Sequence, residues 1–372
     1  MLAYQDRLGS VIDDVVRPQA ADVDVNGKFP RDAVAALGEQ GILGLTIPEA
    51  LGGGGGGLEE AADVVRQLAE VCGSTAMVVL MHYAGTVLID NHGPEEVRRA
   101  IGAGRHLTTL AFSERGSRSH FWAPQSSATT VETGVCLDAH KSWVTSAGEE
   151  DSYVWSSRPL AADGPMSLWL VPSDLAGLAV GGSFDGLGLR GNGSVPVEAD
   201  NAVISADAAL GADGAGLDLA LAEVLPWFLV MSAAFSVGLM GAVVAETGGH
   251  LTSTRLEHLD QSLAEQPLTR VDHARMRIAT DQASALVGDT LAALASGRED
   301  AMLRVLEVKA AAGEAAVTVT DLAMKICGGA AFRKELGIER RFRDARAARV
   351  MAPTTDALLD FVGRAINGLP LL

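Results

Sequence analysis

Apolar positions in the first third of the chain recur with the spacing of amphipathic helices. Ala33, Ala36, Leu37 and Ile42 show this spacing, and glycines close the apolar stretch. Residues three and four apart lie on one face of an α-helix, so these positions can form a continuous buried stripe. The pattern therefore predicts a helical domain at residues 1–106.

A run of six glycines interrupts this helical domain at residues 52–57. Glycine adopts many backbone conformations, and no Gly-Lys-Ser/Thr sequence follows that would indicate a phosphate-binding loop. We therefore expect a flexible connector between two helices.

The pattern changes near Leu107, where short alternating and β-branched runs begin. Glycine and aspartate residues separate these runs, as they do at turns between strands. A middle β domain is therefore predicted at residues 107–207. Its clearest strand-like runs are 107–112, 128–131, 142–145 and 167–171.

Helical spacing returns in the last part of the chain and continues to Leu372. Alanine, which favours helices, is frequent throughout this part. A C-terminal helical domain is therefore predicted at residues 208–372. No repeat period is present, so the three parts are expected to be lobes of one α+β architecture. The long helical segments are 217–253, 268–297 and 300–327.

One apolar segment, residues 224–245, contains no charged residue. An uncharged run of about 18 or more residues is long enough to cross a membrane. Pro226 and several serines and glycines interrupt this one, however, and Glu223 and Glu246 flank it in place of basic residues. We therefore expect a buried core helix and no membrane association.

Composition narrows the classes of function. The 372 residues are 48% hydrophobic and 20% charged, which is typical of a globular protein. The net charge of -18 argues against nucleic acid as a partner, because binding to a phosphate backbone requires clustered Lys and Arg. Cys72, Cys136 and Cys327 lack metal-ligand spacing, so we expect reduced thiols, no metal site and a cytoplasmic protein.

Two polar clusters follow predicted strands and are candidates for binding chemistry. One extends from Ser113 to Ser119 and the other from Lys141 to Gly148. Hydroxyl groups and free backbone N–H groups after a strand can hold an anion or the edge of a heterocycle. The same residue types also close ordinary turns, which is the preferred interpretation from spacing alone.

These clusters, in a chain of helical, β and helical parts, resemble the acyl-CoA dehydrogenase family over most of the sequence. Ile-Pro-Glu at 47–49, followed by glycines, is similar to the family's "IPE…GG" element. Residues 110–119 resemble its "TEPGAGS" strand, and residues 141–145 resemble its "K-x-W-I-T" strand. Residues 326–332 and the Arg-Asp-Ala at 343–345 resemble the "GG-x-G" and "RDA" elements of the last helices. Several motifs in the family's order are far more specific than any one alone.

The resemblance implies a β-barrel-like middle lobe, a C-terminal four-helix bundle and an FAD cofactor. Ser113 would bond to the flavin pyrimidine edge, Trp143 would pack on the isoalloxazine ring, and Thr145 would reach toward N5. Ser119 would lie near the pyrophosphate. Arg255 would reach the FAD of a neighbouring subunit, which implies a homodimer or homotetramer. The other implied cofactor positions are Gly328, Gly329 and Thr354.

The resemblance also identifies a group that the chain lacks. In the family, a glutamate removes a proton from Cα of an acyl thioester while a hydride leaves Cβ, and a general base of this kind is worth about 10²–10⁴-fold in rate. Ala352 stands at the usual glutamate position, and Phe228 stands at the alternative one. Asp356 and Glu223 are weak replacement candidates, for which a structural role is preferred. No catalytic residue is therefore assigned.

Three functions are compatible with these residues. The first is α,β-dehydrogenation of an acyl thioester, carried by CoA or by an acyl-carrier protein, with a non-standard base and an electron acceptor of unspecified identity. The second is a flavin-dependent monooxygenase of the same fold. The third is a non-catalytic flavin-binding partner subunit. We prefer the first to the third, because a non-catalytic scaffold has no need of Ser113, Trp143 and Thr145 together. We prefer it to the second because related monooxygenases often use a histidine near the last helices, and none of the eight histidines lies beyond position 273.

Overall fold

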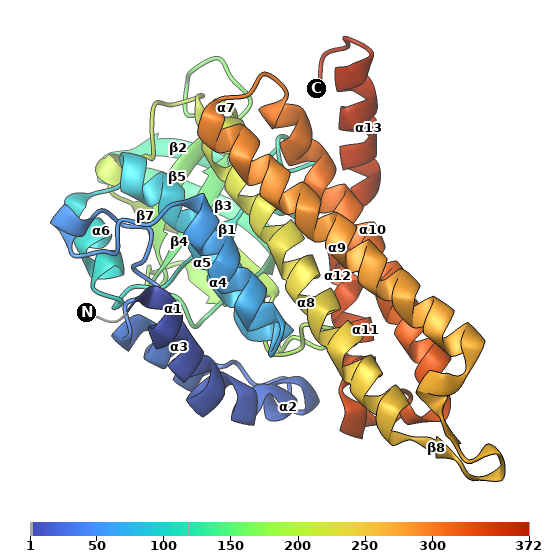
Figure 1. The fold of residues 1–372 in the computed structure, drawn as a ribbon. Coiled ribbons are helices and arrows are strands. Elements are labelled where there is room, and N and C mark those ends of the chain that lie inside the picture. The colour runs from blue at the N-terminus through green and yellow to red at the C-terminus, as the bar shows by residue number, and fades with distance from the viewer. Residues whose placement is uncertain (1–2, 118–119, 372) are drawn as a thin grey trace. The chain divides into compact units, whose positions relative to one another are not determined.

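The computed structural model describes residues 3–117 and 120–371, which form two compact units (Figure 1). Each unit is built from several stretches of the chain. The first contains the residues up to Val64, Ser74–Asp185 and Arg190–Phe228. The second contains Val65–Gly73, Gly186–Leu189 and the residues from Leu229 onward.

The N-terminal part is helical, as predicted. A π-helical turn at Ile12–Val16 follows the first helix directly, and apolar residues of this part, such as Leu8 and Leu37, are buried. Ala33 and Leu37 of the predicted stripe are almost completely buried, and so is Ile42, which lies in the turn beyond the end of that helix at Glu39. The helices are α1 (Tyr4–Val11), α2 (Arg17–Val25), α3 (Arg31–Glu39), α4 (Leu58–Ala69), α5 (Gly73–His92) and α6 (Glu95–Gly102).

The glycine run is not the flexible connector that the sequence suggested. Gly54, Gly55 and Gly56 donate backbone hydrogen bonds to the carbonyl oxygens of residues 44, 47 and 45. A Cβ atom at Gly53 would lie 2.1 Å from the carbonyl oxygen of Ile47, so no other residue fits there without movement of the main chain. The glycines therefore allow the backbone of residues 53–56 to pack closely against that of residues 44–47.

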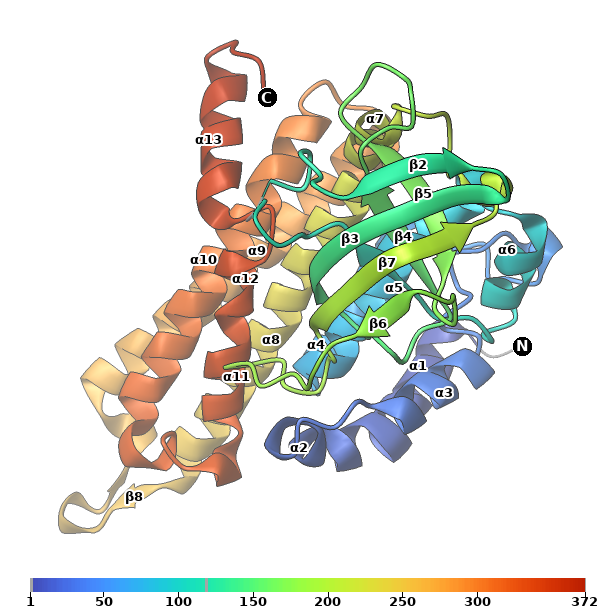
Figure 2. The same cartoon turned by 180° about the vertical axis from the view of Figure 1, so that it is seen from behind.

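Two sheets form the middle of the first unit, and they do not close into a barrel (Figure 2). One has the order β1-β4-β5, with β1 parallel to β4, and the other is an antiparallel sheet of order β2-β3-β7-β6. The β middle part is thus confirmed, but its barrel-like closure is not found among the described strands. The strands are β1 (Thr108–Ala111), β2 (Ser127–Val131), β3 (Gly134–Val144), β4 (Ser152–Ser157), β5 (Ser167–Pro172), β6 (Leu178–Val180) and β7 (Val195–Ile204).

The two sheets share one hydrophobic core. Buried and exposed residues alternate along most of β7 and along the second half of β3, so one face of their sheet contributes to this core. All six residues of β4 are buried. Trp155 and Trp169 are the largest fully buried side chains and lie opposite each other on β4 and β5.

The second unit is mainly helical and has α10 at its centre. This helix packs against α9, α11, α12 and α13, and its many alanines allow close approach. A two-stranded hairpin of β8 (Arg255–Leu256) and β9 (Gln261–Ser262) follows α8 (Figure 1). The helices are α8 (Leu225–Ser253), α9 (Pro267–Ser296), α10 (Ala301–Cys327), α11 (Ile338–Ala345), α12 (Ala347–Val350) and α13 (Thr355–Ile366).

The uncharged apolar run lies in a continuous helical segment, Gly216–Ser253, that includes α7 (Gly216–Leu219) and α8. By length and composition this segment could cross a membrane, but 83% of its most apolar window is buried inside the protein. Such burial is expected of a core helix, because a membrane span presents apolar residues to lipid.

A buried ion pair joins the two sheets. Beyond the end of β1, Glu114 forms an isolated bridge with Lys141 of β3, and Lys141 Nζ lies 2.5 Å from Glu114 Oε1. Lys141 Nζ also donates to the Ser156 carbonyl oxygen at 2.6 Å, and the second carboxylate oxygen accepts from the N–H groups of Gln125 and Ser126. The Lys141 charge lowers the pKa of Glu114 against the effect of burial. Both charges are thus satisfied by fixed neighbours.

Replacing Lys141 with Met is expected to destabilise the protein by about 3–5 kcal/mol, because the Glu114 carboxylate would stay buried without its counter-charge. The double variant Glu114→Gln/Lys141→Met should recover much of this loss. Urea unfolding followed by tryptophan fluorescence measures both effects. Arg17→Met, which removes an exposed pair with Asp13, is the control and should cost about 0.5 kcal/mol or less. Equal costs for Lys141→Met and Arg17→Met would contradict the assigned role.

Candidate functional site

Ser113, Trp143 and Thr145 lie in the first unit at the ends of β1 and β3. The N–H of Ser142 donates to the carbonyl oxygen of Ser113 at 2.9 Å, which joins the two polar clusters beside the Glu114–Lys141 pair. The structure therefore brings together two motifs that are about 30 residues apart in sequence. Ser119, the fourth predicted position on these motifs, lies outside the described residues.

Trp143 is turned outward by a bulge in β3. The pairing of β3 with β7 shifts between Lys141 and Val144, and Trp143 adopts a φ of 58°. This conformation is costly for a bulky residue and recurs at functional positions. The indole is 69% exposed, and the ring of Phe184 packs edge-on against it with centroids 6.5 Å apart. One flat aromatic surface is therefore presented to solvent.

Thr145 is buried in the turn that follows β3. Its hydroxyl group lies 3.1 Å from the hydroxyl of Ser194, whose N–H donates to the Asn192 side chain. The N–H of Ser146 donates to the Asn192 carbonyl oxygen at 2.9 Å. Because a hydroxyl both donates and accepts, Thr145 can bond to Ser194 and to a ligand together.

This group of residues fits the isoalloxazine part of a flavin. An exposed indole supplies an apolar face, and two hydroxyl residues with strand-end backbone groups supply polar contacts at its edge. A planar heterocycle with a polar rim requires both features. The donor set is therefore suitable for FAD, as the motifs imply.

The remaining predicted cofactor residues lie in the second unit. Gly328 ends α10 with a φ of 56°, and a Cβ atom at Gly328 or Gly329 would meet no atom within 4 Å. Thr354 is the N-cap of α13, and its hydroxyl oxygen accepts from the N–H of Ala357 at 3.3 Å. Arg255 is half-exposed and pairs with Asp260 within its own hairpin.

The Arg-Asp-Ala motif has a structural role within the second unit. The N–H of Leu189 donates to Asp344 Oδ1 at 2.6 Å, and Arg343 donates to the carbonyl oxygen of Leu187 at 3.1 Å. A Cβ atom at Gly188 would lie 2.6 Å from the Arg343 main chain. The motif therefore holds residues 186–189 tightly against α11.

The two residues that the resemblance places at the base positions, Phe228 and Ala352, carry no ionisable group. Phe228 is 7% exposed, and Ala352 lies partly exposed between α12 and α13. Asp356 is exposed in the first turn of α13. Glu223 accepts hydrogen bonds from Asn91 and His92, both at 2.8 Å, so it fastens the end of α5. These contacts of Glu223 with another helix support a structural role for this residue, as the sequence suggested.

One residue that sequence reasoning missed is Lys309. Its ammonium group is buried in the second unit and donates to the carbonyl oxygens of Ala348, Met351 and Pro353. These residues surround Ala352. The sequence holds one weak signal for Lys309, since Val305, Val308 and Ala312 lie at helical spacing around it.

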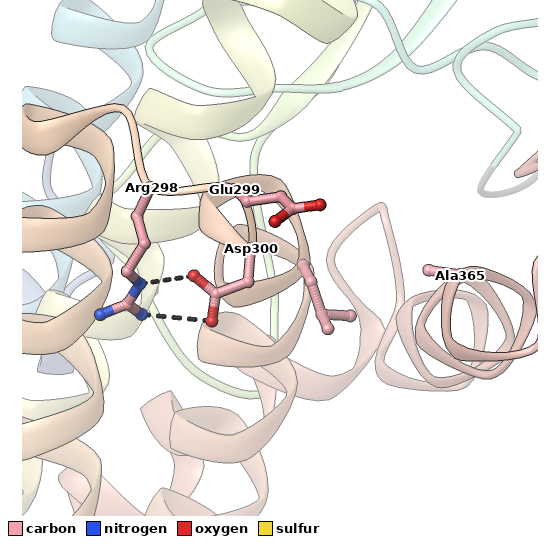
Figure 3. Close-up of a pocket in the computed structure, with 5 residues that line it drawn as sticks. Arg298, Glu299, Asp300 and Ala365 are labelled. Atoms are coloured by element: carbon pink, nitrogen blue, oxygen red, sulfur yellow. Dashed lines mark hydrogen bonds and ion pairs between the residues drawn. The ribbon is translucent and has the colours of Figure 1, made fainter.

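A shallow cavity of about 480 Å³ lies apart from all of these residues, near the start of α10 (Figure 3). Figure 3 shows Arg298 paired with Asp300 at its rim, and Glu299, Leu303 and Ala365 complete the lining. The Arg298 donors are occupied by Asp289 and Asp300. The cavity is open to solvent and contains none of the predicted cofactor positions.

Comparisons with known proteins cover nearly the whole chain. Three models of acyl-CoA dehydrogenase domains match it: the N-terminal domain at residues 2–103, the middle domain at 109–202 and the C-terminal domain at 214–367. The mitochondrial short-chain specific acyl-CoA dehydrogenase of Bos taurus is 28% identical over 354 residues, which are 91% of this chain and 83% of that protein.

Solved structures show the same fold. The butyryl-CoA dehydrogenase of Megasphaera elsdenii has a TM-score of 0.91 with 20% identity and covers 99% of both chains. A structure described as the FAD complex of PigA has a TM-score of 0.90 with 17% identity, and covers 98% of this chain and 96% of its own. From the three matching domain models, in their order along the chain, it follows that this protein belongs to the acyl-CoA dehydrogenase family.

Proposed function

We propose that this protein is an FAD-dependent oxidoreductase that removes hydrogen from Cα and Cβ of an acyl thioester, with a base other than the family's usual glutamate. The observation that carries the proposal is the group formed by Ser113, Trp143 and Thr145 in a chain that matches all three family domains. The acyl group would be carried by CoA or by an acyl-carrier protein.

The residues of the first unit would hold the flavin ring. Trp143 offers its exposed indole as a packing surface, and the Phe184 contact limits the directions in which that indole can turn. Thr145 and Ser113 would orient the ring through its polar edge. FAD, when bound, supplies the acceptor for the hydride that leaves Cβ. Ser119, on the same motif, would lie beside the pyrophosphate.

The residues of the second unit would bind the rest of the cofactor. Gly328 and Gly329 leave open space for close approach of a ligand to the main chain. Thr354 would also contact FAD, since its hydroxyl oxygen accepts from the N–H of Ala357 and its O–H can still donate to a ligand. Arg255 would reach the cofactor of a neighbouring subunit in a homodimer or homotetramer, after it leaves its contact with Asp260.

The base is the unassigned part of this mechanism. Ala352 and the buried Phe228 cannot accept a proton, so a carboxylate or another basic group must come from elsewhere. The same two apolar positions favour a second candidate function, flavin-dependent oxygenation, which does not require proton removal from Cα. The two functions differ in what reduces the flavin.

Purified protein is expected to carry oxidised FAD, detected by its visible absorption, and to lose this colour when mixed anaerobically with a suitable acyl thioester. A panel of acyl-CoA and acyl-carrier thioesters is the probe, and the corresponding free acids are the control. Bleaching by a reductase with oxygen-dependent product formation, but never by a thioester, would support oxygenation in place of dehydrogenation. Absence of bound flavin after reconstitution would contradict both.

Trp143→Ala is expected to weaken FAD binding by about 10-fold or more, because the ring loses its aromatic packing surface. Trp143→Phe keeps a flat apolar ring and should change the affinity much less. Titration of apoprotein with FAD, followed by flavin fluorescence, measures both variants. Unchanged affinity in Trp143→Ala would remove this residue from the proposed site.

Asp356→Asn is expected to leave the rate of thioester-driven bleaching within about 2-fold of wild type, because an exposed carboxylate in solvent lacks the desolvated position of a general base. It should slightly lower the melting temperature, since a negative charge in the first turn of α13 stabilises that helix. Stopped-flow absorption and a thermal melt give the two values. Complete loss of bleaching with FAD still bound would instead identify Asp356 as the base.

A further inference from the structure

Lys309 occupies an unusual environment in the middle of α10. The residue is 1% exposed, and its ammonium group donates to three main-chain carbonyl oxygens: Ala348 at 3.2 Å, Met351 at 2.9 Å and Pro353 at 2.8 Å. An ammonium group has three N–H donors, so each finds one acceptor. A buried lysine is costly unless its hydrogen bonds are satisfied, and here they are.

The three acceptors belong to the short segment 348–353, which leads from α12 to α13. Carbonyl groups at the end of a helix have no partners within that helix and require others. Lys309 supplies these partners from α10. At the far end of the segment, the Thr354 hydroxyl caps α13. The main chain on both sides of Ala352 is therefore fixed.

Gly313, one turn further along α10, strengthens this contact. A Cβ atom at Gly313 would lie 3.3 Å from the Cβ of Ala348, so α10 and α12 are close together at this point. The glycine allows Lys309 to reach the segment with its full set of hydrogen bonds. Ala348 is therefore held both by packing against Gly313 and by its hydrogen bond from Lys309.

The charged form of Lys309 matches the three acceptors. A neutral amine has only two N–H donors, and its lone pair would face a carbonyl oxygen. Burial lowers the pKa of Lys309 to about 7. The carbonyl groups act in the opposite direction, because hydrogen bonds to the ammonium form favour that form.

We propose that Lys309 is a positioning residue that fixes the main chain around Ala352, at the place where the family supplies its base. This role rests on the proposed thioester chemistry. The methyl group of Ala352 is then held at a fixed position beside the acyl Cα. Residues 348–353 form a rigid side of the binding site, and the thioester is aligned against it. Lys309 acts through these residues and does not touch the substrate.

The first test compares Lys309→Met with Lys325→Met. Lys325 is also on α10, but it is two-thirds exposed and pairs with Asp272. Amide hydrogen exchange, read by mass spectrometry of peptides that cover residues 345–358, should become about 10-fold faster or more in Lys309→Met. Lys325→Met should leave these peptides unchanged. Equal exchange of these peptides in Lys309→Met and wild type would overturn the proposal.

The second test separates positioning from general stability. In anaerobic reduction by a thioester, Lys309→Met should lower the limiting rate of flavin bleaching by about 10- to 100-fold, because small displacements of a site wall cost this much in alignment. The thioester concentration at half-maximal rate should change by less than about 3-fold. An unchanged limiting rate would overturn the positioning role even if hydrogen exchange increased.

The proposal stays testable if Lys309→Met does not fold, or if no thioester reduces the wild-type flavin. If Lys309→Met does not fold, Lys309→Gln takes its place, since its amide group keeps two N–H donors at this position but not the third. Faster exchange confined to residues 345–358 would then support the proposal, and unchanged exchange would overturn it. If no thioester bleaches the wild-type flavin, the proposed function fails by itself, whereas the hydrogen-exchange comparison still decides whether Lys309 fixes the segment.

Discussion

The Glu114–Lys141 ion pair is the constraint on which the first unit depends. It connects the end of β1 to β3, and through Ser156 it also connects both to β4. A charge pair inside a core gains little net stability over an apolar pair of the same shape, but it is specific about which strands meet. The pair therefore also fixes the positions of Ser113, which precedes Glu114, and of Trp143, which lies two residues after Lys141.

Much of this fold could be predicted from periodicity, and the failures have physical causes. The strand-like runs at 107–112, 128–131 and 167–171 correspond closely to β1, β2 and β5. Strand β4 was not predicted, because all of its residues are buried and it shows no alternation. The glycines at 52–57 look flexible by composition, yet their lack of side chains serves close packing of backbone.

The residues of the candidate site can be named from the sequence, but the contacts between them cannot. Motifs indicate Ser113 and Trp143 because they depend on residue type and local order. The partner of a buried charge depends on tertiary structure, so the pairing of Glu114 with Lys141 is not readable from a sequence. Lys309 shows the same limit, since a lysine in an alanine-rich helix is normally expected to face solvent. The placement of Ala352 and Phe228 at the expected base positions, in contrast, follows from the motifs alone and requires no knowledge of tertiary structure.

The hairpin of β8 and β9 has a consequence for assembly. Arg255 is already bonded to Asp260 within this hairpin, and both side chains are open to water. Exposed ion pairs of this kind contribute little to stability and weaken as salt is added. An arginine held so loosely can exchange its own aspartate for another anion at small free-energy cost. The proposed contact of Arg255 with the cofactor of a neighbouring subunit would then exchange one ionic partner for another, would be sensitive to ionic strength, and would gain little free energy from charge alone.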